Sequence, residues 1–315
     1  METLSLVSIL LGVPQTEVVL TRHTYDYDAL NQLIREDLCT SGCETGPTGE
    51  TTLYQYDGQG NRSITERYAY TSPGTAPDPT DLIDTVTFTM TESWADQLSS
   101  AYGNTYTYDA QGNVLTKTHV QSGHVTSYAW EGRTLVGIVV KDENGVTTQE
   151  VTYTYDDQGI RTSKTVDGVL HTYVTDGSRV LVETWGNNTI QYTYDLDGKV
   201  ISATINGTEY FYQHNIQGDV TALALSTGVV VVRYVYDAWG NVVSMSGSLS
   251  STIGEINPVR YRGYTQDSET GFHYLQSRYY DPTIGRFISS DGWLGEPGMV
   301  LSHNMYVYAL NNPVL

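Results

Sequence analysis

A Tyr-x-Tyr-Asp motif recurs along this chain and constrains its fold more than any other feature. Most copies continue with a glycine-containing turn and then an apolar alternation, as in Gly112-Asn113-Val114-Leu115. Weaker copies lie between the clear ones, at Tyr68-Ala69-Tyr70, Tyr128-Ala129-Trp130, Tyr173 and Tyr210-Phe211-Tyr212. With them the motif recurs at an interval of roughly twenty residues, which is typical of a repeat architecture, in which one supersecondary unit is stacked many times. The clear copies are Tyr25-Asp26-Tyr27-Asp28, Tyr54-Gln55-Tyr56-Asp57, Tyr106-Thr107-Tyr108-Asp109, Tyr153-Thr154-Tyr155-Asp156, Tyr192-Thr193-Tyr194-Asp195 and Tyr234-Val235-Tyr236-Asp237.

Each copy predicts one β-hairpin. In a strand, Tyr-x-Tyr places both rings on one face, the aspartate opens a turn through its side chain, and glycine takes the left-handed position. Consecutive strands of about six to eight residues then pair antiparallel into a long twisted sheet. The 30 glycines and 26 tyrosines among 315 residues agree with an all-β fold. The best helical signal, Met90 to Ser100 with Trp94 and Leu98 four apart, is short enough to be a loop turn instead.

The repeats run almost end to end, which favours one continuous array over residues 1–257, followed by a distinct segment over 258–315. Within the array, the proline-rich stretch 71–84 is the best candidate for a loop or insertion. The apolar run from Leu4 to Val13 lacks a basic flank and is too short for a membrane span. We interpret it as a strand or a truncated repeat.

The stretch 258–291 predicts two adjacent hairpins. In the first, strands at 260–264 and 272–275 flank a turn at 267–271. In the second, strands at 278–280 and 286–288 flank the turn Asp281-Pro282-Thr283-Ile284-Gly285, where proline fixes φ and glycine permits a positive φ.

The same stretch resembles the core signature of the RHS and YD-repeat family. Many positions match in one order, which makes the signal stronger than a lone short motif. The matching residues are Arg260-Tyr261-Arg262-Gly263, Asp267-Ser268-Glu269-Thr270-Gly271, Arg278-Tyr279-Tyr280-Asp281-Pro282, Gly285-Arg286-Phe287, Ser290-Asp291, Asn304-Met305-Tyr306-Val307-Tyr308 and Asn311-Asn312-Pro313.

The resemblance implies a hollow β shell that encloses a C-terminal toxin, closed by a core segment that acts as an intramolecular aspartyl protease. It places the two catalytic aspartates at Asp267 and Asp291, whose carboxylates must come close enough to share a proton. Backbone hydrogen bonding in a turn explains an aspartate at position 267 equally well. The chain departs from the family pattern at Gln266, where relatives have arginine, and no D-P-x-G-L cleavage motif follows Pro313 within the sequence.

Charge and cysteine content limit the classes of ligand that the chain is expected to bind. A net charge of −20 argues against a nucleic-acid surface, because phosphate contacts need clustered lysine and arginine. The arginines at 260, 262, 278 and 286 are expected to stack on tyrosines or pair with local acids. No metal or cofactor site is expected, since Cys39, Cys43 and His23 lack spaced partner ligands; the two cysteines are either free or joined in a small disulfide.

Together these features predict a structural shell segment of an RHS-type toxin delivery protein, secreted or at the cell surface. Its partner is a C-terminal toxin domain or the remaining shell segment, because about ten repeats alone predict an open half-shell with an exposed edge strand. A cell-surface module that stacks tyrosines on carbohydrate and a truncated fragment without independent function are the alternatives. Tyrosines on a concave inner wall favour encapsulation, and tyrosines clustered outward favour glycan binding.

Overall fold

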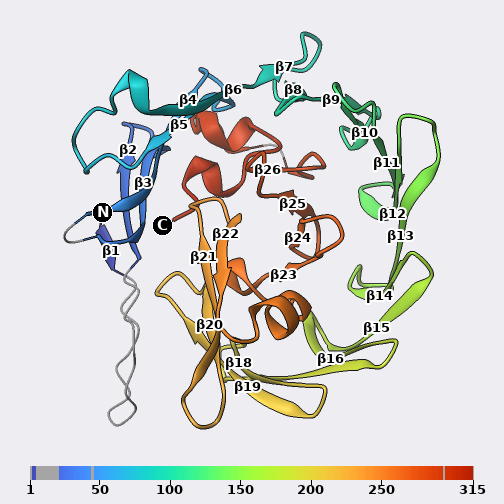
Figure 1. Ribbon diagram of the computed structural model, residues 1–315. Coiled ribbons are helices and arrows are strands. Elements are labelled where there is room, and N and C mark those ends of the chain that lie inside the picture. The colour runs from blue at the N-terminus through green and yellow to red at the C-terminus, as the bar shows by residue number, and fades with distance from the viewer. Residues whose placement is uncertain (1, 5–20, 44–45, 294, 315) are drawn as a thin grey trace. The chain divides into compact units, whose positions relative to one another are not determined.

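The computed structural model of the chain describes residues 2–4, 21–43, 46–293 and 295–314. The predicted all-β fold is confirmed, because antiparallel hairpins follow one another in sequence order (Figure 1). The chain divides into two compact units, the first formed by residues 1–102 with 292–315 and the second by residues 103–291. The boundary between the array of 1–257 and the segment 258–315 stays a prediction from the sequence. The apolar run from Leu4 to Val13 lies almost wholly outside the described residues.

The second unit consists of a long sheet and two small hairpins. In the sheet each strand pairs with the strands before and after it, and we call strands β9 to β22 the wall. The wall strands are β9 (Asn104–Tyr108), β10 (Val114–His119), β11 (Val125–Glu131), β12 (Thr134–Lys141), β13 (Thr147–Tyr155), β14 (Arg161–Val166), β15 (Val169–Asp176), β16 (Arg179–Trp185), β17 (Asn188–Tyr194), β18 (Val200–Ile205), β19 (Thr208–His214), β20 (Val220–Ala224), β21 (Val230–Tyr236) and β22 (Val242–Ser246).

Residues 258–291, which we call the core hairpins, follow the wall and a short π-helix, η2 (Ser250–Gly254). The wall curves around them, so that they lie on its concave side (Figure 1). Their elements are η3 (Tyr261–Gly263), β23 (Thr265–Gln266), β24 (His273–Tyr274), β25 (Tyr279–Asp281) and β26 (Arg286–Phe287).

The first unit has a sheet of the same kind, formed by β1 to β6, and it also contains the short paired strands β7 and β8. Its elements are β1 (Glu2–Leu4), β2 (Arg22–Tyr27), β3 (Leu33–Ser41), β4 (Thr48–Tyr56), β5 (Arg62–Ala69), η1 (Pro79–Asp81), β6 (Leu82–Thr87), β7 (Thr89–Met90), β8 (Leu98–Ala101), η4 (Val300–His303) and η5 (Ala309–Asn311). The predicted loop at 71–84 runs irregularly as far as η1 and enters β6 at its end. A disulfide joins Cys39 to Cys43.

The turns follow the chemistry expected from the repeat. In the turn after β21, Asp237 Oδ1 accepts the backbone N–H groups of Trp239 at 3.0 Å and of Asn241 at 2.9 Å. Gly240 adopts a φ of +94°, which only glycine takes readily. The amide of Asn241 closes the turn by donating to Asp237 Oδ2 at 2.7 Å. The same aspartate and glycine roles recur at Asp57 with Gly60, Asp109 with Gly112, Asp156 with Gly159 and Asp195 with Gly198.

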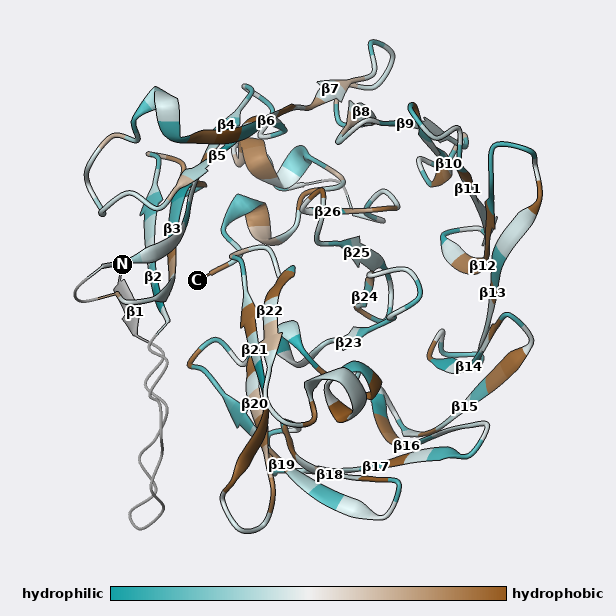
Figure 2. Cartoon of the chain, viewed as in Figure 1, coloured by the Kyte–Doolittle hydropathy of each residue, from teal (hydrophilic) through white to brown (hydrophobic). Residues whose placement is uncertain are grey.

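The repeat tyrosines lie in pairs on one face of their strands, as predicted. The rings of Tyr234 and Tyr236 are 6.2 Å apart and stacked. The hydroxyl of the second tyrosine donates to a backbone carbonyl of the preceding strand: Tyr236 to Val220 at 2.8 Å and Tyr194 to Val180 at 2.6 Å. Each motif therefore ties its own hairpin to the one before. Polar residues are interspersed with apolar ones along the wall, as an alternating strand pattern requires (Figure 2).

Of the two possibilities for Met90 to Ser100, the loop turn is the one that forms, because residues 91–97 connect β7 to β8 and Leu98 is a buried strand residue. One other local expectation was wrong in detail. The first core hairpin forms later than predicted, at β23 and β24, because Arg260 to Gly263 turns instead of extending. Arg262 takes a left-handed φ of +52°, and its backbone N–H donates to the carboxylate of Asp219 at 2.8 Å.

Candidate functional site

The candidate site is centred on Asp267, which opens the turn between β23 and β24. Its side chain is fully buried and binds two cations from wall strand β14. Both terminal nitrogens of Arg161 donate to the carboxylate, Nη2 to Oδ1 at 3.0 Å and Nη1 to Oδ2. Lys164 Nζ donates to Oδ1 at 2.9 Å and also to the carboxylate of Glu269 at 2.9 Å. We call these four residues the ion cluster.

A β-bulge explains how Arg161 and Lys164 reach the same face of β14. Residues three apart in a regular strand point to opposite faces. Here Tyr155 pairs with Arg161 while the adjacent Thr154 pairs with Ser163, so β14 carries one extra residue at this point. The extra residue rotates the strand locally and turns both cations towards the core hairpins.

Aromatic rings surround the Arg161 guanidinium. The centroids of Tyr274 and Tyr173 lie 4.4 and 5.1 Å from its central carbon, and that of Tyr153 lies 5.4 Å away. Cation–π attraction of this kind strengthens when water is excluded, and Arg161 is itself buried. The guanidinium is thus held by a carboxylate in its plane and by rings from both the wall and the core hairpins.

The charges of the cluster fix the protonation of Asp267. Burial alone would raise its pKa, but the nearby Arg161 and Lys164 outweigh burial and lower the pKa to about 2. Glu269 behaves in the opposite way, because burial and the Asp267 charge raise its pKa more than Lys164 lowers it. Asp267 is therefore ionised at neutral pH.

The second predicted site residue, Asp291, lies just after β26 and is partly exposed. Its Oδ2 is 2.8 Å from Nη2 of Arg278, whose guanidinium stacks 3.6 Å from the centroid of the Phe287 ring. The structure thus places both aspartates in the core-hairpin region of the second unit but binds each to different cations. The expectation for the arginines of this region is confirmed at Arg278 and also at Arg260, which lies 5.5 Å from the Tyr234 ring centroid.

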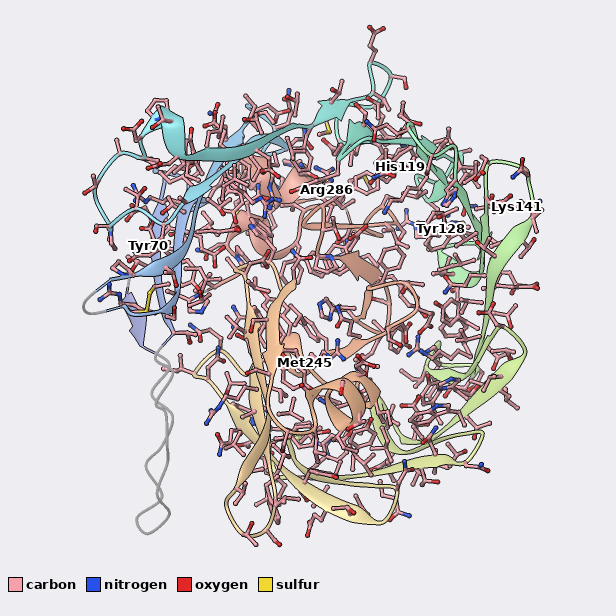
Figure 3. All side chains as sticks on the ribbon, in the orientation of Figure 1. Tyr70, His119, Tyr128, Lys141, Met245 and Arg286 are labelled. Atoms are coloured by element: carbon pink, nitrogen blue, oxygen red, sulfur yellow. A yellow bond between two sulfur atoms is a disulfide. The ribbon has the colours of Figure 1, made fainter. Side chains whose placement is uncertain are left out.

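Further hydrogen bonds attach the core hairpins to the wall along their length. Their donors and acceptors come from the turns of the repeats, such as the Asn241 amide, which donates to the carbonyl of Pro282 at 2.9 Å. Ser290 donates to the carbonyl of Gln111 at 2.7 Å, and Tyr280 to that of Trp239 at 2.8 Å. Tyr128 lies on the side of β11 that faces the core hairpins, where it stacks on Phe272, while Lys141 points outward (Figure 3).

Arg161 and Lys164 were not among the predicted site residues, although the sequence carries a signal for Arg161. In three other repeats the second residue after the turn glycine is apolar: Val114 after Gly112, Val200 after Gly198 and Val242 after Gly240. In the repeat with Gly60 this position is also an arginine, Arg62, which is buried. Arg161 takes this inward position after Gly159. A charge at a position that the repeat reserves for the core indicates a buried partner.

Two searches of the described residues give negative results. Within them, no group of three or more histidine, cysteine or acidic side chains is arranged to hold a metal ion. The described part of the chain also contains no helix that is long and apolar enough to cross a membrane.

Comparison with known families agrees with the repeats and the core signature. The family model of the teneurin YD-shell matches residues 13–314. This chain belongs to the teneurin YD-shell family. The predicted RHS and YD-repeat relationship is therefore confirmed, and the wall with its enclosed core hairpins is part of a YD-shell.

The YD-shell relatives include much longer proteins. The tRNA3(Ser)-specific nuclease WapA of Bacillus spizizenii is 36% identical over 295 residues, which cover 92% of this chain and 11% of that protein. The tRNA nuclease WapA of Bacillus subtilis matches to the same extent. The chain thus spans about a tenth of the length of these relatives.

Solved structures show the same fold. The crystal structure of TcdB2-TccC3-TEV superposes with a TM-score of 0.64 at 20% identity, over 93% of this chain and 15% of that one. The long antiparallel sheets of this YD-shell are thus shared with the Tc toxin structures.

Proposed function

We propose that this YD-shell is a structural segment of an RHS-type toxin delivery protein, that it encloses a C-terminal toxin, and that its core hairpins seal the enclosure. The observation that carries the proposal is the attachment of the core hairpins to the concave side of the wall through the buried pair Arg161–Asp267. Because the core hairpins are attached on the concave side of the wall, the polypeptide that continues after them starts from that side.

The orientation of the tyrosines supports a shell rather than a carbohydrate-binding surface. The repeat tyrosines Tyr106, Tyr153, Tyr234 and Tyr236 are at most 8% exposed. Tyr153 lies 5.4 Å from the ring of Tyr279 and Tyr236 lies 6.2 Å from that of Tyr261, both in the core hairpins. Rings used in this way are not available to stack on external sugars.

Protease protection tests the enclosure. An epitope tag at the C-terminus of the natural polypeptide should survive a nonspecific protease under native conditions and be removed rapidly in urea. Replacement of both cluster cations, Arg161→Gln with Lys164→Met, should expose the tag in the native state. Arg133→Gln, a change at an exposed wall arginine, is the matched control. Equal digestion of the tag with and without urea in the unchanged protein contradicts enclosure.

We propose, as a second part of this function, that Asp267 and Asp291 form an aspartyl dyad that cleaves the polypeptide after the core segment. In such a dyad one carboxylate is ionised and takes a proton from water, while the other is protonated and donates to the scissile carbonyl oxygen. The Arg161 and Lys164 charges suit Asp267 to the ionised role. Asp291 then takes the acid role, which requires it to leave Arg278 and bind a proton instead.

Intact-mass spectrometry of the natural polypeptide tests the dyad. Asp291→Asn should yield uncut product, whereas Asp197→Asn, at an exposed turn position, should leave cleavage unchanged. Asp291 is the more informative position, since changing Asp267 also disrupts the ion cluster. Normal cleavage in Asp291→Asn rejects the protease assignment and leaves the shell role standing.

We further propose that the protein acts outside the cell or at its surface. The Cys39–Cys43 disulfide supports this, because disulfides persist in oxidising compartments and are rare in the cytosol. Thiol alkylation followed by mass spectrometry should find these cysteines unmodified in protein recovered from the culture medium. Complete alkylation there contradicts the proposal.

A further inference from the structure

A cavity of about 800 Å³ lies in the second unit, and Arg161 of the ion cluster is among its lining residues. Strands β14 to β19 and their turns line one side of it, and residues 259–276 of the core hairpins line the other. Its volume falls in the range of pockets that hold small molecules, about 300–1,000 Å³. The proposed shell function assigns no role to this cavity.

Two exposed cations line the cavity. Arg179 begins β16 and Lys199 precedes β18. The Arg179 guanidinium packs against Gly198, the residue before Lys199, where an added Cβ would lie 2.7 Å from Nη2. Among the described residues, neither Arg179 nor Lys199 forms an ion pair, with Asp197 or with any other carboxylate. Both side chains are exposed, so a ligand reaches them from solvent.

The acids that line the cavity do not neutralise these cations. Glu183 is paired with His171 at 3.0 Å, and Asp197 is exposed in the turn. Burial and the nearby Lys199 lower the pKa of His214 to about 4, so this lining residue is neutral at pH 7. In a chain with a net charge of −20, two cations that line one cavity and form no ion pair among the described residues make this part of the surface locally positive.

The rest of the lining suits an anion with a ring or a short chain. Tyr192 and Tyr194 lie 6.4 Å apart and line the cavity beside Arg179, which is 5.9 Å from the Tyr194 centroid. Tyr264 and Tyr274 line the side formed by the core hairpins. Aromatic walls with a few converging polar groups are typical of ligand pockets.

We propose that this cavity binds an oxyanion, a phosphate or carboxylate group held by Arg179 and Lys199, with the remainder of the ligand packed on the tyrosine walls. Arginine and lysine supply the donors that such groups accept in charge-assisted hydrogen bonds. A phosphorylated small molecule and the carboxylates of an acidic peptide share this chemistry. The proposal concerns a site in the wall and does not depend on the presence of a toxin.

Isothermal titration calorimetry on the 315-residue chain tests the site with two probes, pyrophosphate and a tetraglutamate peptide. At about 0.15 M salt, long-range attraction is largely screened, so saturable binding reports a local site. At least one probe should bind with one-to-one stoichiometry. The probe that binds more tightly identifies the source as a free phosphate compound or a polypeptide carboxylate.

The double variant Arg179→Gln with Lys199→Gln should weaken that binding by roughly tenfold or more, as expected for lost charge-assisted bonds. The matched control, Arg133→Gln with Lys141→Gln, removes two exposed wall cations elsewhere and should leave affinity unchanged. Circular dichroism verifies that both variants fold. Absence of saturable binding for both probes, or equal loss in the two double variants, overturns the proposal. Neither result bears on enclosure, which the protease-protection experiment measures separately.

Discussion

Arg161 and Asp267 are 106 residues apart in the sequence and form a bidentate ion pair, with both side chains at most 2% exposed. The pair joins the middle of the wall to the first core hairpin. Two buried charges are tolerated because each satisfies the other, while Lys164 and the surrounding tyrosine rings complete the environment. Removal of Asp267 leaves Arg161 as a buried charge without its carboxylate, whereas removal of Arg161 leaves Asp267 with Lys164 as its one remaining cation in the ion cluster.

Breaking a buried ion pair by removing one partner costs about 3–5 kcal/mol. Arg161→Gln should lower the free energy of unfolding by about 3 kcal/mol, the lower end of this range, because Lys164 still pairs with Asp267. Urea unfolding followed by near-ultraviolet circular dichroism measures the change. Arg133→Gln, at an exposed position, should stay within about 0.5 kcal/mol of the unchanged protein. A loss below about 1 kcal/mol for Arg161→Gln contradicts a structural role for the pair.

Acid should weaken the fold through Asp267. Because the folded-state pKa is about 2 and the ordinary value is 3.8, the ionised carboxylate stabilises the fold above about pH 4. That stabilisation, about 2 kcal/mol, is lost as the pH falls from about 4 to 2. Glu269 acts in the opposite sense: its raised pKa favours the fold at low pH, and this contribution is lost as the pH rises through the raised value.

Urea unfolding of the unchanged protein and of Asp267→Asn between pH 2 and 7 separates the two effects. The difference in unfolding free energy between them should be largest near neutral pH and shrink as the pH approaches 2. A difference that stays constant over this range shows that the charge of Asp267 is not what stabilises the attachment.

The repeat architecture is predictable from the sequence because its determinants are local. Tyr-x-Tyr-Asp, the turn glycine and the following apolar residue all act within one hairpin, so each copy specifies its own turn and register. The turn at Asp237 has the hydrogen bonds that this chemistry requires. The family is predictable from the sequence for the same reason, because the core signature is an ordered series of such local motifs.

The ion cluster is not predictable in this way, because its members are brought together only by tertiary folding. Nothing near Asp267 in the sequence points to Arg161, and the bulge that aligns Arg161 with Lys164 is visible only in the pairing of β13 and β14. Likewise, Arg262 turns instead of extending because Asp219, 43 residues earlier, accepts its N–H. Tertiary contacts of this kind override local strand propensity.

The hydroxyl of Tyr236 should contribute to stability, unlike that of Tyr153. Tyr236→Phe removes the bond to Val220 O, leaves a buried carbonyl without this donor, and should cost about 1 kcal/mol. Tyr153→Phe is the matched control, because its buried hydroxyl has no hydrogen-bond partner in the described part of the chain. Removal of the Tyr153 hydroxyl should leave the free energy of unfolding unchanged or raise it. Equal losses for the two variants, measured by urea unfolding, show that ring packing rather than the hydroxyl bond matters.

The core hairpins approach the turn that contains Gly240 so closely that substitution of this glycine should destabilise the fold. Gly240 has a φ of +94°, and an added Cβ would lie 2.6 Å from the ring of Tyr261, which is 2% exposed and bonded to the carbonyl of Ala238. Gly145 provides a matched comparison, with a φ of +79° and no atom within 4 Å of an added Cβ.

Gly145→Ala should cost about 1 kcal/mol, the conformational penalty of a left-handed alanine. Gly240→Ala should cost about 2 kcal/mol more, because Tyr261 must also shift within a packed core. Thermal unfolding of both variants gives the comparison. Similar losses at the two glycines mean that Tyr261 moves aside freely, so the first core hairpin is held to the wall by the ion cluster rather than by close packing against this turn.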